Sequence, residues 1–377
     1  MSSLLAAGKP NTLTPRQIED GWILLFDGET AFGWQNAKSS GWTVENGCLT
    51  CRAPGAGRLL RTTTEFADFE LELEVQAQGG ATAAVFVRCP GEASPGEDNS
   101  YEAVLAGKDA GWSAGDIRAV ARATTKPAGK GWRRFTIIAR GGALLLEQNA
   151  GVLSGAVNLP IRRGRLALWA KGAGQVRVRN VRLRPLGLQS IFNGKDLSGW
   201  RVLPGHKSVY SVTPEGWLNV RNGSGDLQTE KTYGDFVLQL DIISNGDHLN
   251  SGVFFRAIPG KFWSGYESQI RNQWRDGDRT KPVDYGTGGI YNRQPARKVV
   301  SSDYKWFTKT IIAHGRHIAV WVDGCQVSDW TDPRPPNENA RVGYRAKPGV
   351  ISLQGHDPTT NLSFRNIRVM EYPPAQP

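Results

Sequence analysis

The chain has 377 residues, 39% of them hydrophobic, and a formal net charge of +11. This length exceeds one ordinary domain and is enough for two domains with separate cores. The charge alone would suggest nucleic-acid binding, but the basic residues are scattered, and no recognition helix, zinc-finger spacing or RNA-binding aromatic motif accompanies them. We interpret the one local basic run, 177–184, as a solvated strand face, and we expect no nucleic-acid partner.

Residues 1–20 are expected to form a polar N-terminal extension. Within it, Leu13-Thr14-Pro15 predicts the start of one short helix. The first ten residues lack the charged leader and apolar run of a signal peptide, and no later segment is apolar for long enough to cross a bilayer. The sequence is therefore compatible with a cytoplasmic protein or with one whose leader is missing from this version.

The four cysteines do not have the spacing of a metal site. Cys48 and Cys51 stand without a following histidine pair, and positions three apart face opposite sides of a strand. We expect ordinary thiols, and a bridge from Cys48 or Cys51 to Cys89 remains an alternative.

The chain contains an internal repeat. Residues 24–28 recur as 190–194, an offset of 166 residues. Further matches follow in the same order: 69–73 with 236–240, 85–88 with 253–256, 101–102 with 266–267, 136–139 with 310–313, and 178–182 with 364–368. A series of matches in one order indicates a tandem duplication.

Each copy has the pattern of short antiparallel strands. Between Phe69 and Val75, apolar and acidic residues alternate strictly. We predict an all-β chain of two tandem β-sandwiches, a degenerate first one at 21–187 and a second one at 188–374. One sheet of each sandwich should offer its outer face to a ligand. The linker is short, so the two sandwiches are expected to touch.

A polar cluster is predicted around residues 250–269. Arg256 alternates with apolar neighbours, so it should lie on the strand face opposite Val253 and Phe255. On the next strand, Glu267 and Gln269 share a face. A cation, a carboxylate and an amide on one surface suit a polar ligand of the size of a sugar. A structural ion pair between Arg256 and Glu267 is an equally open interpretation.

The two copies differ mainly in this cluster. Gln354 and His356 of the second copy correspond to Trp169 and Lys171 of the first, and Gln269 corresponds to Val104. Gln354 and His356 share a strand face and would cost free energy of burial unless something uses them. Arg256 and Glu267, together with Asn250, complete the cluster of the second copy; of these, the arginine and the glutamate survive in the first as Arg88 and Glu102.

The loop at 271–293 is long, glycine-rich and charged. Trp263, Trp274 and Tyr291 flank or belong to it. Aromatic faces stack on the C–H side of sugar rings, so the loop is predicted to form the lip of a saccharide cleft.

Several motifs resemble those of the 3-keto-disaccharide hydrolase family, long known only as domain of unknown function 1080. They are FNGKDLSGW at 192–200, NSGVFFR at 250–256, GYESQI at 265–270, TGGIY at 287–291 and LQGH at 353–356. The resemblance is strong over 190–372 and weaker over 22–185. It implies a concanavalin-like jelly roll and a periplasmic or extracellular location. It also implies glycoside substrates whose 3-hydroxyl has been oxidised to a ketone by a partner dehydrogenase.

The chemistry of such a substrate assigns roles to the cluster. A ketone at C3 acidifies the hydrogen on C2, so a base can remove it, the enolate expels the group on C1, and water adds afterwards. We expect Glu267 or His356 as base and Arg256 as partner of the enolate oxygen. Gln269, Gln354 and Tyr291 would orient the sugar, and Asn250, Trp263 and Trp274 would help to bind it.

The same residues allow other interpretations. Glu267 and His356 could hold a divalent metal ion; no other cofactor is expected. A hydrolase with paired carboxylates is less favoured, because the cluster contains one convincing carboxylate. The principal alternative is a lectin-like protein that binds glycans without catalysis, which would not need the titrating side chain of His356.

Overall fold

The computed structural model describes residues 9–35, 39–89 and 100–374. The chain forms two compact units, unit 1 (Met1–Leu186 with Pro373–Pro377) and unit 2 (Gly187–Tyr372). The predicted short helix is confirmed as α1 (Pro15–Glu19). It begins at Thr14, whose side chain accepts a hydrogen bond from Gln17 N while the Gln17 side chain accepts one from Thr14 N, a capping box.

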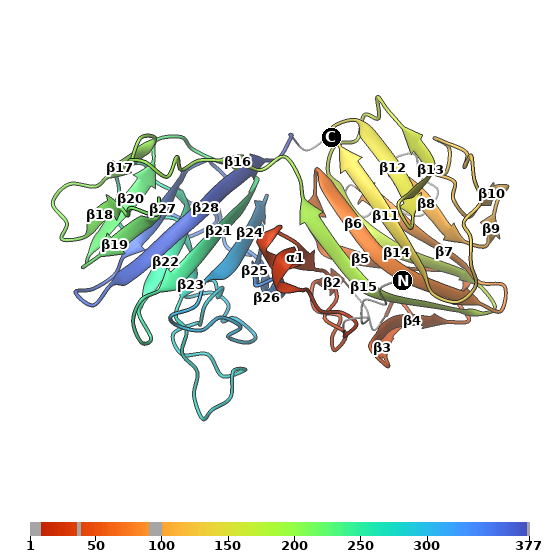
Figure 1. The fold of residues 1–377 in the computed structure, drawn as a ribbon, viewed down its shortest axis with the longest axis horizontal. Helices are drawn as coiled ribbons and strands as arrows, with labels where there is room; N and C mark the ends of the chain where they lie inside the picture. The colour runs from red at the N-terminus through yellow and green to blue at the C-terminus, as the bar shows by residue number, and fades with distance from the viewer. Residues whose placement is uncertain (1–8, 36–38, 90–99, 375–377) are drawn as a thin grey trace, which may run out of the picture. The chain divides into compact units, whose positions relative to one another are not determined.

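Unit 1 consists of two antiparallel sheets and a small hairpin (Figure 1). The eight-stranded sheet contains, in spatial order, β13 (Gly151–Ala156), β12 (Ala143–Gln148), β11 (Arg133–Arg140), β6 (Phe69–Gln78), β15 (Gln175–Pro185), β4 (Cys48–Arg52) and β3 (Trp42–Glu45), with β1 (Ile23–Leu24) beside β15. The five-stranded sheet contains β2 (Trp34–Gln35), β5 (Gly55–Phe66), β14 (Gly164–Gly172), β7 (Thr82–Cys89) and β8 (Tyr101–Ala106). The hairpin pairs β9 (Lys108–Asp109) with β10 (Trp112–Ser113).

Unit 2 has the same construction. Its eight-stranded sheet contains β26 (Cys325–Thr331), β25 (His317–Val322), β24 (Phe307–His314), β21 (Phe236–Ser244), β28 (Asn361–Glu371), β19 (Leu218–Arg221) and β18 (Val209–Val212), with β16 (Gln189–Ser190) beside β28. Its five-stranded sheet contains β17 (Trp200–Val202), β20 (Gly225–Thr229), β27 (Val350–Gly355), β22 (Ser251–Ala257) and β23 (Tyr266–Ile270).

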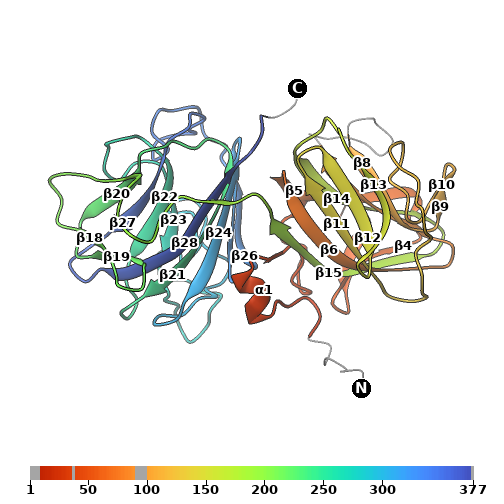
Figure 2. The same cartoon turned by 45° about the horizontal axis from the view of Figure 1, so that its top comes forward.

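The order of strands is identical in the two units when each strand is matched to its counterpart in the repeat. The predicted duplication and the all-β sandwich fold are therefore present in the structure, and Figure 2 shows the two stacked layers of each unit. In unit 2, Leu238 of one sheet packs in the same core as Val253 and Leu353 of the other. Alternation along each strand sends the neighbours of these residues to the outer face, which is how the sequence positions the site.

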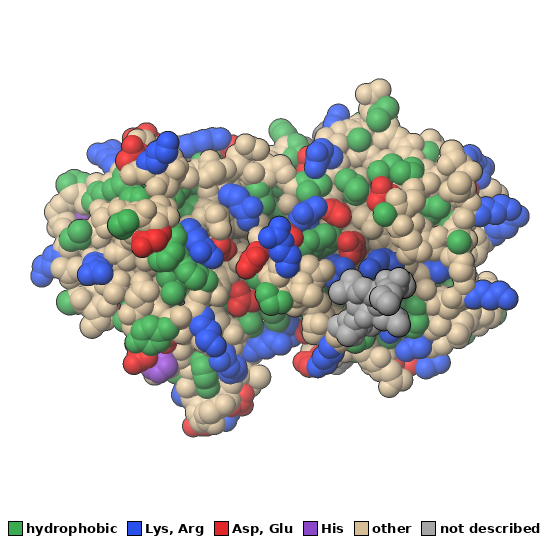
Figure 3. Space-filling model, viewed as in Figure 1, with side chains coloured by type: hydrophobic (Ala, Val, Ile, Leu, Met, Phe, Trp, Pro, Cys, Tyr) green, Lys and Arg blue, Asp and Glu red, His purple; other side chains and the backbone are tan. Residues whose placement is uncertain are grey.

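The basic run at 177–184 is neutralised across the sheet. Arg179 pairs with Glu74, Arg182 with Glu72, and Arg184 with Glu70. These pairs oppose an interpretation of the run as a phosphate-binding stripe. On the face shown in Figure 3, Lys and Arg side chains are likewise dispersed rather than gathered.

The described part of the chain has neither a disulfide nor a helix that could span a membrane. All four cysteines are free thiols there, so the alternative of a bridge to Cys89 is wrong. None of the described helical segments has the length and hydrophobicity to span a membrane.

Candidate functional site

A pocket of about 270 Å³ lies on the outer face of the five-stranded sheet of unit 2. It forms there because Val253 and Leu353 turn inward, so their strand neighbours turn outward. Seven of the nine residues that the sequence nominated line this pocket. The full lining is Ser224, Asn250, Phe262, Trp263, Glu267, Gln269, Tyr291, Gln354 and His356.

Glu267 is held at one oxygen only. Its Oε2 accepts a hydrogen bond of 2.6 Å from Nη2 of Arg341, whereas Oε1 has no hydrogen-bond partner among the described residues. Burial raises the pKa of Glu267 above its usual range, and the Arg341 guanidinium opposes that rise. The carboxylate can lie over β22 because residue 252 is glycine: a Cβ there would be 2.5 Å from Oε1. The result is a buried carboxylate with one oxygen available to a ligand.

Arg341 was not predicted from the sequence. It approaches Glu267 from the loop between β26 and β27, and its guanidinium lies 4.3 Å from the ring centre of Trp263 and 5.4 Å from that of Tyr291. These rings hold the cation in place by cation–π attraction. Arginines are frequent in this chain and the loop has no periodicity, so no sequence pattern distinguished this one.

The amide side chains form a second part of the site. Asp284, also missed by the sequence analysis, accepts hydrogen bonds of 2.9 Å from Nδ2 of Asn250 and from Nε2 of Gln269. Asn250 Oδ1 and Gln354 Oε1 are buried and have no hydrogen-bond partner within the described residues. Buried polar atoms without partners are costly, and a polyhydroxylated ligand could satisfy both.

A second carboxylate, Asp226, lies on the strand next to Gln354 and contacts the backbone of Trp263, two residues that line the pocket. Asp226 pairs in register with Gln354, is 1% exposed, and accepts a hydrogen bond of 3.0 Å from the backbone N–H of Trp263. Burial raises the pKa of Asp226 to about 6. The expectation of a single convincing carboxylate was therefore incomplete. The register between β20 and β27 brings Asp226 here, and that register could not be read from the sequence.

His356 stands at the rim of the pocket, just beyond the end of β27. Its side chain is 42% exposed, and its Nδ1 lies 2.8 Å from Oδ2 of Asp357. The prediction that burial of His356 costs free energy is wrong, because the strand ends at Gly355 and the imidazole ring reaches solvent. The prediction holds for Gln354, which is 3% exposed and therefore does lose free energy of hydration on burial.

The side chains present do not match a metal site. A metal ion bound to Glu267 would lie beside the Arg341 guanidinium, which disfavours a second cation. The described residues contain no group of three His, Cys, Asp or Glu side chains that could hold an ion together. We therefore derive no step through a metal ion.

Arg256 lies outside the pocket. Its φ of +47° and the register shift between Phe254 and Ala257 break the alternation of β22, so the side chain leaves the outer face. It is 1% exposed, forms an ion pair of 2.8 Å with Asp235, and donates to the carbonyls of Gly234, Gly315 and Arg345. Both predictions for Arg256 are corrected: it neither faces the site nor pairs with Glu267.

Trp274, which was expected to help to bind the sugar, is not among the residues that line the pocket. It forms an isolated bridge with Pro282, and the Arg279 guanidinium stacks 4.0 Å from its ring centre. The loop at 271–293 therefore contributes Tyr291 and Asp284 to the site, while its tip is stabilised by its own contacts.

A buried lysine supports the strand that carries Glu267. Lys309 is fully buried, and its Nζ donates hydrogen bonds of 3.1 Å to Ser268 O and 2.8 Å to Gln269 O. Burial lowers the pKa of Lys309 to about 7, and the negative charge of Glu267 opposes that fall. Lys309 lies on β24, which pairs with β21, and the residue at the same register position of the equivalent pair in unit 1, β11 and β6, is Phe135. The lysine is therefore specific to the unit that has the polar cluster.

Known proteins similar to this chain include enzymes and binding modules. A 3-keto-disaccharide hydrolase of Bacteroides thetaiotaomicron is 31% identical over 96 residues, a match that covers 22% of this chain and 33% of the relative. A candidate glycosyl hydrolase from Parabacteroides distasonis is 24% identical, with a TM-score of 0.40 over 49% of this chain and 99% of that one. A carbohydrate-binding module from Bacillus subtilis is 17% identical, with a TM-score of 0.35 over 47% of this chain and 97% of that one.

The family assignment comes from a different comparison. The model of the 3-keto-α-glucoside-1,2-lyase-like domain matches twice, at residues 21–184 and 187–370, and so spans most of both units. The two matches follow the internal repeat and its two sandwiches. The chain therefore belongs to the family of 3-keto-α-glucoside-1,2-lyase-like domains, with one copy in each unit.

Proposed function

We propose that the pocket of unit 2 cleaves 3-keto-glycosides by elimination followed by hydration. The observation that carries this proposal is the state of Glu267, a buried carboxylate with one oxygen fixed by Arg341 and the other without a hydrogen-bond partner among the residues that the structure describes. A base for the C2 hydrogen needs such an oxygen, positioned and partly desolvated. Family membership supports the substrate class.

The proposed reaction begins at C2 of the sugar. Glu267 Oε1 removes the proton, and the electron pair of the broken C–H bond forms the enolate with the C3 ketone. Gln354 and Tyr291, which line the pocket, are placed to donate hydrogen bonds to the sugar oxygens in this step. Arg341 opposes the rise that burial causes in the pKa of Glu267 and so favours its ionised form. Arg256, which was expected to hold the enolate oxygen, lies outside the pocket and has no part in the proposed step.

The enolate then expels the leaving oxygen from C1, and a C1–C2 double bond forms. His356, exposed at the pocket rim, is the proposed acid that protonates this oxygen. Water adds across the double bond, with its hydroxyl at C1 and its proton at C2, which releases the 3-keto sugar. No oxidant or reductant is consumed, because elimination and hydration together amount to hydrolysis.

The test is the release of aglycone from a 3-keto-glucoside, measured by chromatography with wild type and with Glu267→Gln. We expect a loss of at least about 100-fold in kcat/KM, as for the removal of a general base. The matched control is Glu102→Gln, at the equivalent register position of unit 1, which should leave the rate unchanged. The same assay with EDTA tests the metal interpretation.

The acid limb of the pH profile is a second measurement. Because the pKa of Glu267 is raised, kcat/KM should fall with decreasing pH at a midpoint above the usual value for glutamate, about 4.3. A lectin-like function makes a different prediction. His356→Gln would then spare the binding of an unmodified glycan, and wild type would release no aglycone from any 3-keto-glucoside; that pair of results would refute catalysis.

A further inference from the structure

Unit 1 has a pocket at the position equivalent to the unit 2 site. Glu102 lies opposite Phe86 in register, as Glu267 lies opposite Phe254. The pocket is larger, about 430 Å³, which is within the usual range of about 300–1,000 Å³ for sites of small ligands. It is lined by Ala56, Gly57, Leu59, Glu102, Asp109, Arg118, Trp169 and Lys171.

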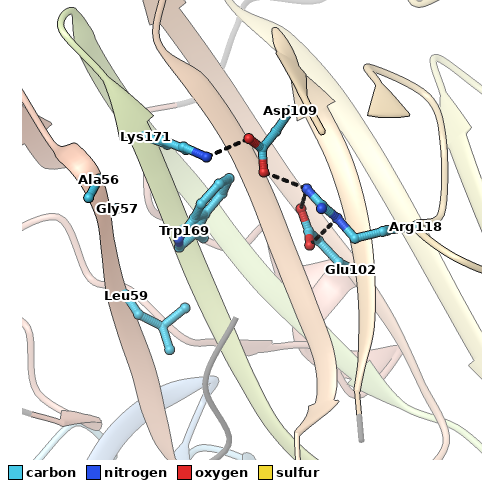
Figure 4. Close-up of a pocket in the computed structure, with 8 residues that line it drawn as sticks. All are labelled: Ala56, Gly57, Leu59, Glu102, Asp109, Arg118, Trp169 and Lys171. Atoms are coloured by element: carbon cyan, nitrogen blue, oxygen red, sulfur yellow. Dashed lines mark hydrogen bonds and ion pairs between the residues drawn. The ribbon is translucent and has the colours of Figure 1, made fainter. Parts of the chain in front are cut away.

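Four charged side chains form one connected network on one side of this pocket (Figure 4). Arg118 contacts Glu102 at 2.7 Å and Asp109 at 2.6 Å, and Lys171 contacts Asp109 at 2.6 Å. Burial raises the pKa of Asp109, but hydrogen bonds from Lys171 and Arg118 outweigh it and leave the pKa below its usual range. With Glu102 ionised, the network is electrically neutral. Glu102 is buried, Asp109 and Arg118 are half-buried, and Lys171 is 40% exposed. Removing the first three from water costs free energy that an apolar filling would avoid.

The opposite side of the pocket is apolar. Trp169 lies centrally in Figure 4, between the charged network and the residues of β5. Leu59 pairs in register with Trp169, and Gly57 lets the indole approach β5 closely. A Cβ at Gly57 would lie 2.8 Å from Nε1 of Trp169, and its φ of +141° also favours glycine. A copy of the domain that had only lost its function could have filled this pocket with larger side chains. Here the pocket is open, with one charged wall and one apolar wall.

We propose that the unit 1 pocket binds a neutral mono- or disaccharide without cleaving it. An apolar wall with an indole on one side and fixed donors and acceptors on the other matches the C–H face and the hydroxyls of a sugar. An anionic ligand would have to displace Asp109 from Lys171 and Arg118, because both cations are already paired.

Cleavage is excluded by the state of Glu102. Arg118 covers both of its oxygens, with Nε at 2.7 Å from Oε2 and Nη2 at 3.1 Å from Oε1. No carboxylate oxygen comparable to Glu267 Oε1 is therefore available as a base. Lys171 also replaces the histidine of unit 2, so the proposed acid is missing as well.

Binding by this pocket does not depend on the proposed reaction, so its test uses no turnover. Full-length Glu267→Gln protein is titrated with trehalose, maltose, cellobiose and sucrose, and binding is followed by saturation-transfer NMR. The same titration is made on a Leu59→Trp background, which fills the unit 1 pocket but leaves the charged network intact. We expect at least one disaccharide to bind at least about ten-fold more weakly after Leu59→Trp.

Two further variants keep the test decisive. Ala56→Phe narrows the pocket from an exposed position on β5, so it serves if Leu59→Trp fails to fold. Val157→Phe, at a site that is 70% exposed and outside the pocket lining, is the control and should not change binding. The proposal is overturned if each disaccharide binds with equal affinity to the Glu267→Gln protein and to the two variants in which the unit 1 pocket is also blocked. It is likewise overturned if no disaccharide binds. Preference for glucuronate over methyl glucoside overturns the assignment to a neutral sugar.

Discussion

Both units have a glutamate buried on the outer face of the five-stranded sheet, and they differ in the arginine that pairs with it. In unit 2, Arg341 comes from the loop before β27 and covers one oxygen of Glu267. In unit 1, Arg118 covers both oxygens of Glu102. Arg118 occupies the backbone position of Tyr291, since the N–H of each donates to the carbonyl of the equivalent glutamate.

This difference separates the requirements of stability from those of function. A buried carboxylate needs a cation in either unit, because an unpaired charge would be costly. How many of its oxygens the cation covers then decides whether the carboxylate can act on a ligand. The same fold thus carries a candidate base in one unit and a closed ion pair in the other.

The largest effect should follow from making unit 2 resemble unit 1 at one position. Register places Ala84 where unit 2 has Gly252. Gly252→Ala would push the Glu267 carboxylate from its place, and we expect kcat/KM to fall by about 1,000-fold, or about 4 kcal/mol, with the fold retained. Steady-state kinetics on a 3-keto-glucoside would measure it. Ala84→Gly in unit 1 is the matched control, and an unchanged rate in Gly252→Ala would argue against Glu267 as the base.

The second prediction concerns a feature that the units share. Arg88 has a φ of +55°, pairs with Asp68 and donates to the carbonyls of Ala67, Gly141 and Ile161, as Arg256 does with its own partners. Arg256→Met and Arg88→Met should each destabilise their own unit by about 3 kcal/mol, because a buried network loses its centre. Hydrogen exchange in increasing urea, read by mass spectrometry, reports the peptides of each unit separately. If Arg256→Met instead abolished turnover without loss of stability, the assignment of a structural role would fail.

The smallest effect, about 1.4 kcal/mol over one pH unit, is a pH dependence expected of unit 2 alone. Burial lowers the pKa of Lys309 to about 7 in the folded protein, whereas the pKa of an unfolded lysine is about 10.4. Between these values the unfolded state binds one proton more, so the stability of unit 2 should rise with pH by about 1.4 kcal/mol per pH unit.

Lys309→Met should remove this slope, and unit 1, with Phe135 at the equivalent position, should not show it. The same exchange experiment over one pH unit, from pH 8 to pH 9, provides the measurement. Identical slopes in wild type and Lys309→Met would show that the lysine stays charged in its buried position.

The sequence predicted what depends on local alternation and failed where geometry is set at longer range. The duplication follows from short motifs that repeat in one order, and the strands of the sandwiches and the shared face of Glu267 and Gln269 follow from period-two patterns. Arg256 was misplaced because one residue with positive φ interrupts that period. Arg341 and Asp226 were missed because a loop path brings one to Glu267 and a strand register brings the other to Gln354, and neither leaves a local pattern.

Gly252 has a consequence for how a duplicated gene can change. Glycine and alanine codons differ at a single nucleotide. One point mutation can therefore convert the glycine that leaves room for the Glu267 carboxylate into an alanine, the residue that unit 1 has at the equivalent position, Ala84. A lineage carrying two copies could abandon the base in one of them in a single step while the other copy kept the original activity. The copy that changed would still hold a folded sheet and an open pocket, on which selection for another task could act at once.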